Sequence, residues 1–229
     1  MRHLDGMHKL ALAALIATST LVIIAGTAWG IRLFTMSRNQ ATTPSTNAAN
    51  YAIGGFPMTG NPAPDFNLIN QFGQPITLSS LRGREVVLAF IDSRCTSLCP
   101  LTAQIMYDAK ARLGSSAASR VVLVAVNANP VATSVATVQA WSINHGMLHQ
   151  WLFLTGTTQQ LQSIYRLYKV YDQVSSNGAV VHDPIMFIID AQGRERLYFE
   201  TLDSNNPSDL SDEELGLVTG MRQWLSPPQ

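Results

Sequence analysis

Uninterrupted apolar runs alternate with amphipathic stretches over the C-terminal two-thirds of the chain. An apolar run bounded by polar residues is typical of a strand buried on both faces of a sheet. Five such runs predict strands at 86–91, 121–126, 151–154, 185–189 and 197–199. The turn residues Ala191-Gln192-Gly193 separate the last two runs, so we predict that these two strands form a hairpin.

Helical periodicity fills most of the gaps between these runs. In the first gap, apolar residues recur at every fourth position from Leu101 to Leu113, and Gly114 follows where a C-cap is expected. Thr157 and Gln160 form a capping box, which is a usual start of a helix. Helices are therefore predicted at 99–113, 131–146, 158–168 and 211–225.

The resulting order, β-α-β-α-β-α-β-β-α, indicates an α/β fold whose sheet has a parallel part and a closing antiparallel hairpin. Cys95 and Cys99 lie in the turn between the first long strand and its helix. A helix that begins at a cysteine directly after a buried strand narrows the prediction to a thioredoxin-like fold. We assign it to residues 62–229.

The N-terminal quarter of the chain has a different character. Residues 10–31 carry no charge and as a helix would be about 33 Å long, enough to cross the hydrocarbon core of a bilayer. The run is longer than the apolar region of a signal peptide. It contains no cysteine for a lipoprotein anchor. We therefore predict one uncleaved transmembrane helix at 10–31, in contact with the lipid bilayer and preceded by a basic flank at 1–9.

A flexible linker is predicted at 32–61, because Ser, Thr, Asn, Ala, Gly and Pro dominate this segment and no apolar period appears. Charge supports the same division. Residues 1–61 carry four basic groups and one acidic group, whereas residues 62–229 carry eleven basic and fourteen acidic groups. Each flank of the predicted span carries two Lys or Arg residues, so the positive-inside rule leaves its orientation open.

Composition argues against a nucleic-acid-binding protein. The 15 Lys and Arg residues balance the 15 Asp and Glu residues, and such proteins need a basic face. Hydrophobic residues make up 46% of the chain, which supplies a core and excludes disorder throughout. Two cysteines are too few for a disulfide scaffold or a four-cysteine zinc site.

The two cysteines nevertheless predict an active site. They follow the carboxyl end of a strand, where ligand sites form in open α/β sheets. Cys99 also lies at the predicted helix N-terminus, where free amides and the helix dipole favour a thiolate. A thiolate is both the redox nucleophile and a ligand for soft metals. The two cysteines are therefore compatible with metal binding and with a reversible disulfide.

His182 is the candidate third ligand. It precedes Asp183-Pro184, in a loop that lies beside the cysteine turn in thioredoxin-like folds, and Pro184 stands where such folds usually have a cis peptide. Two thiolates and one imidazole form a soft ligand set that suits three-coordinate Cu(I). A structural zinc normally needs a fourth ligand, which Asp92 or Asp183 could supply, so zinc stays open.

The remaining histidines and the methionines are not assigned to a metal. His3 and His8 belong to the basic flank, and His145 and His149 bracket the end of the second predicted helix, where histidine often caps carbonyl groups. The eight methionines are scattered along the chain. The candidate set is therefore Cys95, Cys99 and His182.

The motif CTSLCPLT at 95–102, followed by Val181-His182 and IMFIIDAQG, resembles the SCO/SenC family of membrane-anchored, thioredoxin-fold copper proteins of cytochrome c oxidase assembly. The segments APDFNLINQFGQPITLSSLRGREVVLAF and WLFLTGTTQQLQSIYRLYKVY extend the resemblance over residues 62–200. It implies a copper chaperone that holds a copper ion with Cys95, Cys99 and His182.

The resemblance also implies partners and topology. The copper destination is the binuclear copper centre of cytochrome c oxidase subunit II, whose thiols some members also reduce. A thiol reductase recycles the cysteine pair. The soluble domain lies on the extracytoplasmic side of the cell membrane, with the N-terminus in the cytoplasm.

The chain departs from the family pattern at three places without losing a proposed ligand. Thr96 stands where proline is usual, Asp92-Ser93 replaces an aromatic residue and Thr, and the segment 127–130 (NANP) stands where many members have Asp-Pro. They suggest a divergent subfamily and a shifted redox balance of the thiols.

Two other functions are compatible with the sequence. In a thiol–disulfide oxidoreductase, Cys95 is the nucleophile and Cys99 the resolving cysteine, although the C-x3-C spacing and a nearby histidine favour copper. In a peroxiredoxin-type peroxidase, Thr96 and Cys99 have the required spacing, but Asp92 occupies the position of the expected proline.

Overall fold

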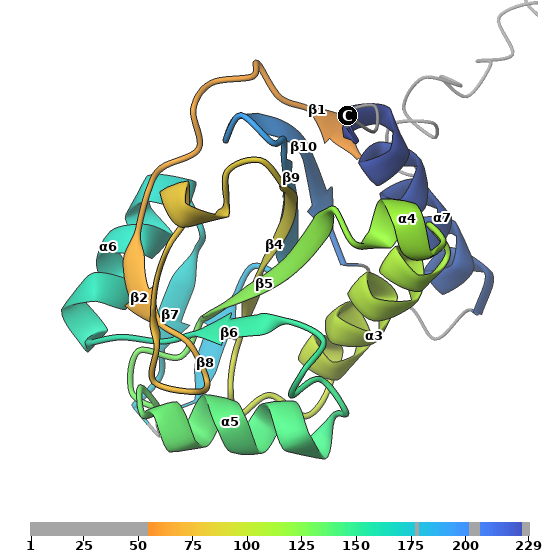
Figure 1. Ribbon diagram of the computed structural model, residues 1–229. Coiled ribbons are helices and arrows are strands. Elements are labelled where there is room, and N and C mark those ends of the chain that lie inside the picture. The colour runs from red at the N-terminus through yellow and green to blue at the C-terminus, as the bar shows by residue number, and fades with distance from the viewer. Residues whose placement is uncertain (1–54, 177–178, 202–206, 226–229) are drawn as a thin grey trace, which may run out of the picture. The chain divides into compact units, whose positions relative to one another are not determined.

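The computed structural model describes residues 55–176, 179–201 and 207–225. A six-stranded sheet has the order β1-β10-β9-β4-β5-β6 (Figure 1). β4, β5 and β6 are parallel, whereas β9 is antiparallel to both β4 and β10, and β1 is antiparallel to β10. The strand bounds are β1 Phe56–Pro57, β4 Glu85–Ile91, β5 Val121–Asn127, β6 Leu152–Leu154, β9 Ile185–Ile189 and β10 Glu195–Glu200.

Helices and a hairpin cover both faces of this sheet (Figure 1). α3 (Leu98–Ala111), α5 (Val135–Asn144) and α7 (Pro207–Trp224) pack on the face formed by the odd-numbered residues of β4. α6 (Thr158–Tyr168), the short helix η1 (Ser79–Leu81) and β2 (Asn67–Ile69), which pairs with β3 (Pro75–Thr77), cover the even-numbered face. The central strands are buried on both sides, which confirms the α/β thioredoxin-like prediction.

Several predicted helix ends are corrected by the structure. The second helix was expected at 131–146, but α5 begins only after Ser134, whose side chain accepts the amide of Thr137. The C-terminal helix was expected from Ser211, but α7 already begins at Pro207, since proline fits the first helical position. The capping box of α6 is confirmed: Thr157 and Gln160 exchange hydrogen bonds.

Short elements without an apolar period were missed. β1 lies within the predicted linker at 32–61, because a two-residue edge strand is defined by its pairing with β10 rather than by a pattern. β7 (Asp172–Val174) pairs with β8 (Val180–His182), and neither strand has an apolar period. α4 (Ser115–Ala118) has Gly114 as its N-cap, whereas the C-cap of the preceding helix is Arg112 rather than the expected Gly114.

The predicted flank at 1–9 and the predicted transmembrane helix at 10–31 lie outside the described residues. Within the described ranges, no helix has the length and apolar character needed to cross a bilayer.

Candidate metal and thiol site

The two cysteines flank the start of α3, at the carboxyl end of β4. The turn from Asp92 to Ser97 joins the two elements, and the amide of Cys95 donates to the carbonyl of Asp92 at 3.0 Å. The side chain of Cys95 is half-buried, whereas Cys99 is buried, and both are free thiols. The sulfur of Cys95 is therefore accessible from solvent, whereas the sulfur of Cys99 is enclosed by the protein.

The two thiols differ strongly in acidity. Hydrogen bonding from the Cys99 thiol and from nearby backbone amides lowers the pKa of Cys95 to about 5, against the opposing effect of burial. The same hydrogen bond, burial and the charge of Cys95 raise the pKa of Cys99 above its ordinary value. At neutral pH, Cys95 is therefore the thiolate and Cys99 the thiol.

The start of α3 acts on Cys95, not on Cys99 as the sequence suggested. The backbone amide of Cys99, one of the free amides of the first helical turn, donates to Cys95 Sγ at 3.5 Å. The Ser97 hydroxyl lies 3.6 Å from the same sulfur. The expectation that the helix N-terminus makes Cys99 the thiolate is thus corrected, because the free amide points back at the preceding cysteine.

His182 lies against Cys99. Its Nε2 is 3.6 Å from Cys99 Sγ, and its Nδ1 is 2.9 Å from the carbonyl oxygen of Asp183. A carbonyl only accepts hydrogen bonds, so Nδ1 carries a proton and Nε2 is the ring nitrogen left for a metal ion. This is the tautomer that a metal-binding histidine adopts when a carbonyl fixes its second nitrogen.

All three predicted residues line one cavity of about 210 Å³. Its other walls are apolar or hydroxyl side chains and backbone, contributed by Phe90, Ser97, Leu98, Thr102, Val180, Val181 and Pro184. Among the described residues, no three His, Cys, Asp or Glu side chains are already disposed as a complete metal site. Cys99 is the central member of the group, since it contacts both Cys95 and His182.

The two carboxylates considered as a fourth zinc ligand do not line this cavity. Asp92 is buried and accepts hydrogen bonds from the amide of Arg94 and the side chain of Asn129. Asp183 accepts the amide of Tyr171 at 2.8 Å. The peptide bond before Pro184, expected to be cis, is trans like every other peptide bond in the described ranges. The site thus contains sulfur and nitrogen donors without a carboxylate.

A polar network behind the turn was not found by sequence reasoning. Asn129 Nδ2 donates to Asp92 Oδ1 at 2.8 Å, and Asn127 Oδ1 accepts the amides of Ser93 and Asn129. Asn127 Nδ2 also donates to the carbonyl of Ala132. The departures from the family pattern at 92–93 and 127–130 were the only available signal. The side chains of the two segments are hydrogen-bonded to each other and fix the start of the turn that contains Cys95.

A second cavity, of about 510 Å³, lies on the other side of Cys95. It separates the cysteine turn from α5 and is lined by Arg94, Cys95, Trp141 and His145 among others. Trp141 Nε1 donates to the carbonyl of Cys95 at 3.1 Å, and the ring of His145 stacks on Trp141. Cys95 therefore borders two cavities, and the indole holds its backbone in place.

Neither of the other described histidines lines the cavity that Cys95, Cys99 and His182 share. His145 caps α5, and its Nδ1 donates to the carbonyl of Trp141 at 2.8 Å, which confirms the predicted capping role. His149 is exposed and stacks on Phe72. Met147 and Met186 are buried in the core.

The chain is similar to proteins of one known family in sequence and in fold. Residues 58–212 match the family model described as SCO1/SenC. The crystal structure of Arabidopsis thaliana ScoI with copper bound is 23% identical, with a TM-score of 0.60 over 72% of this chain and 100% of that chain. The solution structure of apo Sco1 from Thermus thermophilus is also 23% identical, with a TM-score of 0.61 over 74% of this chain and 95% of that chain.

A third structure is that of BsSco, described as a member of the Sco family of cytochrome c oxidase assembly proteins with a disulfide switch. It is 19% identical, with a TM-score of 0.54 over 71% of this chain and 96% of that chain. These structural similarities support the assigned thioredoxin-like fold. No curated protein matches the sequence significantly.

Proposed function

The chain belongs to the SCO1/SenC family, and we propose that it is a copper metallochaperone whose cargo is held by Cys95, Cys99 and His182. The observation that carries the proposal is the shared cavity of these three residues, in which two sulfurs and one imidazole nitrogen meet without a carboxylate. Such a donor set is soft and suits copper at low coordination number better than a structural zinc ion.

The existing contacts prepare this cavity for an ion. The Cys95 thiolate is formed at neutral pH, and His182 Nε2 already lies 3.6 Å from Cys99 Sγ. Binding requires the Cys99 thiol to lose its proton, because the thiolate is the metal ligand. The ion replaces that proton and draws Cys95 and His182 toward Cys99.

Delivery and recycling complete the proposal. The acceptor is the copper centre of cytochrome c oxidase subunit II, whose thiols the same cysteine pair also reduces. The segment at 10–31 anchors the chain in the cell membrane, with the described domain on the extracytoplasmic side. A tether of this kind raises the effective concentration of the domain at a membrane acceptor. A separate thiol reductase restores the Cys95 and Cys99 thiols.

Anaerobic copper titration against a competing chelator tests the proposal on the full chain. We expect one copper ion per chain in the reduced protein, no comparable binding once a Cys95–Cys99 disulfide has formed, and weaker binding in His182→Ala. His149→Ala is the matched control, since it removes an exposed histidine elsewhere. Equal copper affinity in wild type and His182→Ala would show that His182 is not a ligand.

A thiol–disulfide oxidoreductase is the second candidate function. It is favoured by the half-buried, acidic Cys95 beside the buried Cys99, which is the arrangement of an attacking and a resolving cysteine. Catalytic turnover of a disulfide substrate that is undiminished in His182→Ala would favour this function over copper delivery.

A further inference from the structure

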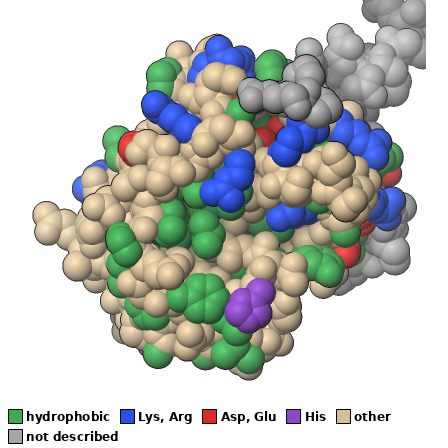
Figure 2. All heavy atoms as spheres, in the orientation of Figure 1, with side chains coloured by type: hydrophobic (Ala, Val, Ile, Leu, Met, Phe, Trp, Pro, Cys, Tyr) green, Lys and Arg blue, Asp and Glu red, His purple; other side chains and the backbone are tan. Residues whose placement is uncertain are grey.

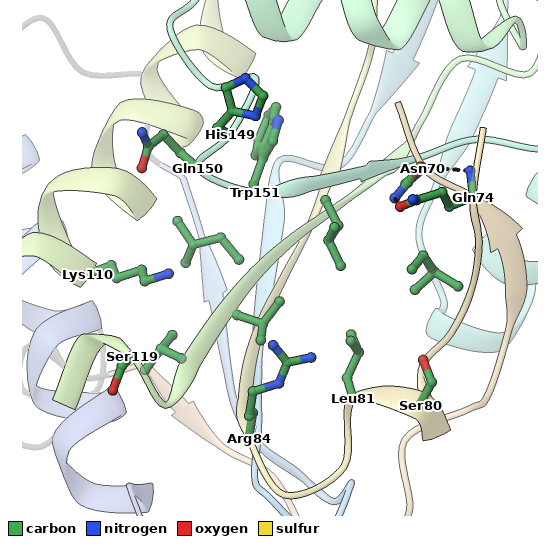
Figure 3. A pocket seen from close by; sticks show the side chains of 15 residues that line it. Asn70, Gln74, Ser80, Leu81, Arg84, Lys110, Ser119, His149, Gln150 and Trp151 are labelled. Atoms are coloured by element: carbon green, nitrogen blue, oxygen red, sulfur yellow. Dashed lines mark hydrogen bonds between the residues drawn. The ribbon is translucent and has the colours of Figure 1, made fainter. Parts of the chain in front are cut away.

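A separate groove of about 460 Å³ lies along β5, away from the cysteines. Figure 3 shows β5 crossing this groove, with Lys110 reaching in from α3 and Arg84 pointing in from the start of β4. Asn70, Gln74 and Ser80 line the side formed by the β2–β3 hairpin and η1, and His149, Gln150 and Trp151 close one end (Figure 3).

The floor of the groove is a stretch of sheet edge without a partner strand in the described part of the chain, and its most accessible residue is Val122, which is 9% exposed. β6 pairs only with Val124–Val126 of β5. The preceding residues Val121–Leu123 line the groove, and on this side they have no partner strand among the described residues. An unpaired strand edge presents amide and carbonyl groups to an incoming extended segment. At about 3.3 Å per residue, this edge accommodates three or four residues of such a segment.

The charges that face the groove are all positive. Its lining contains Arg84 and Lys110 and no Asp or Glu. Neither side chain has an ion pair or a hydrogen bond with another described residue. Burial and the nearby charge of Arg84 lower the pKa of Lys110, so the two cations repel each other in this setting. Figure 2 shows Lys and Arg side chains beside hydrophobic ones on this face, with few acidic side chains.

The two cations come from opposite faces of the sheet. Lys110 belongs to α3, which packs on the odd-numbered face of β4, whereas Arg84 adjoins η1 and Leu81, which belong to the even-numbered face. Successive side chains of a strand added at this edge also point to opposite faces. Two consecutive acidic residues of that strand therefore reach Lys110 and Arg84, one each.

We infer that the open edge of β5 binds an extended segment of a partner protein that carries two consecutive acidic residues. The backbone of the segment pairs with Val121–Leu123, and its carboxylates neutralise Arg84 and Lys110. This docking surface is distinct from the cavity of Cys95, Cys99 and His182 and does not depend on the proposed copper function.

Fluorescence anisotropy on the full chain tests the inference with the labelled hexapeptide Thr-Val-Glu-Glu-Val-Thr. The neutral peptide Thr-Val-Gln-Gln-Val-Thr is its matched probe. We expect the acidic peptide to bind and the neutral one to bind about tenfold more weakly, since two exposed charge pairs contribute about that much together. The double variant Arg84→Gln/Lys110→Gln should show the same loss, and the exposed Arg166→Gln on α6 should not.

Hydrogen exchange then locates the peptide. Bound acidic peptide should slow amide exchange at Val121–Leu123 and leave copper affinity unchanged, which separates this inference from the metal site. Peptide binding that survives the double variant, or protection elsewhere, overturns the inference. So does a concentration-dependent dimer that pairs the β5 edges, because the occupant is then a second copy. Absence of binding by the acidic peptide also overturns the inference.

Discussion

The side-chain amide of Asn129 donates a 2.8 Å hydrogen bond to the carboxylate of Asp92, directly before the cysteine turn. Both groups are buried, and Asp92 Oδ1 also accepts the amide of Arg94 at 2.7 Å. The two residues belong to the segments 92–93 and 127–130, for which the resemblance to the SCO/SenC family predicts departures from its usual sequence. Their contact makes the two departures one structural feature, in which each supplies the partner of the other.

Asn129→Ala should therefore destabilise the domain and loosen the turn. It leaves the buried Asp92 carboxylate without one of its donors, which costs about 1–3 kcal/mol of unfolding free energy. Urea denaturation measures this loss. Because both side chains are in contact, the effect of Asp92→Ala should fall when Asn129 is already alanine; fully additive losses in the double variant would contradict the coupling.

The acidity of Cys95 should be visible in its alkylation rate. With its pKa at about 5, the rate with iodoacetamide should be half-maximal near pH 5 and constant above about pH 7, since only the thiolate reacts. Stopped-flow alkylation over pH 4–10 measures the profile. A midpoint above pH 8 in the wild type would contradict the assigned hydrogen bonds.

Two variants separate the causes of this acidity. Cys99→Ala removes the thiol donor, the largest cause, and should move the midpoint of Cys95 toward that of an ordinary thiol. Cys99→Ser retains a hydroxyl donor and should give an intermediate midpoint. The backbone amide at position 99 is present in both variants, so its contribution is held constant.

Trp141 should act as a positioning residue for the cysteine turn. Trp141→Phe keeps an aromatic ring at this buried position of α5 but removes the Nε1 hydrogen bond to the carbonyl of Cys95. We expect a loss of about 1 kcal/mol in stability and faster amide exchange over 93–97. Trp151→Phe is the control, because Trp151 Nε1 bonds to Ser142 instead. Equal exchange of the turn in both variants would reject the positioning role.

Sequence reasoning predicted the elements that have a long apolar pattern and failed where tertiary pairing decides. β4, β5 and β9 were found because every residue in them is buried. β1 and β8 consist of two and three residues, and their pairing with distant or adjacent strands leaves no periodic signal. The three site residues were found by residue type and order, but which sulfur is ionised depends on where one amide of α3 points.

Glu85 should make the stability of the domain depend on pH. It is 2% exposed at the start of β4, and burial raises its pKa to about 8, against the attraction of Arg120. Neither carboxyl oxygen has a hydrogen-bond partner among the described residues. In the unfolded chain the group titrates near pH 4.5, so between these values the folded state holds a proton that the unfolded state has lost. The free energy of unfolding should fall across this range by about 1.4 kcal/mol per pH unit at most.

Glu85→Gln removes this titration and should flatten the profile between pH 5 and 8. Below about pH 4 both proteins should lose stability alike as the pH falls, since the pKa values of Asp65 and Asp190 are lowered in the folded state of both. Urea denaturation at each pH gives the two curves, and the exposed Asp212→Asn on α7 serves as the control for a lost surface carboxylate. Parallel curves for wild type and Glu85→Gln would mean that Glu85 is ionised in the folded protein. In that case a compensating cation, with Arg120 the first to examine, stabilises the carboxylate in spite of its burial.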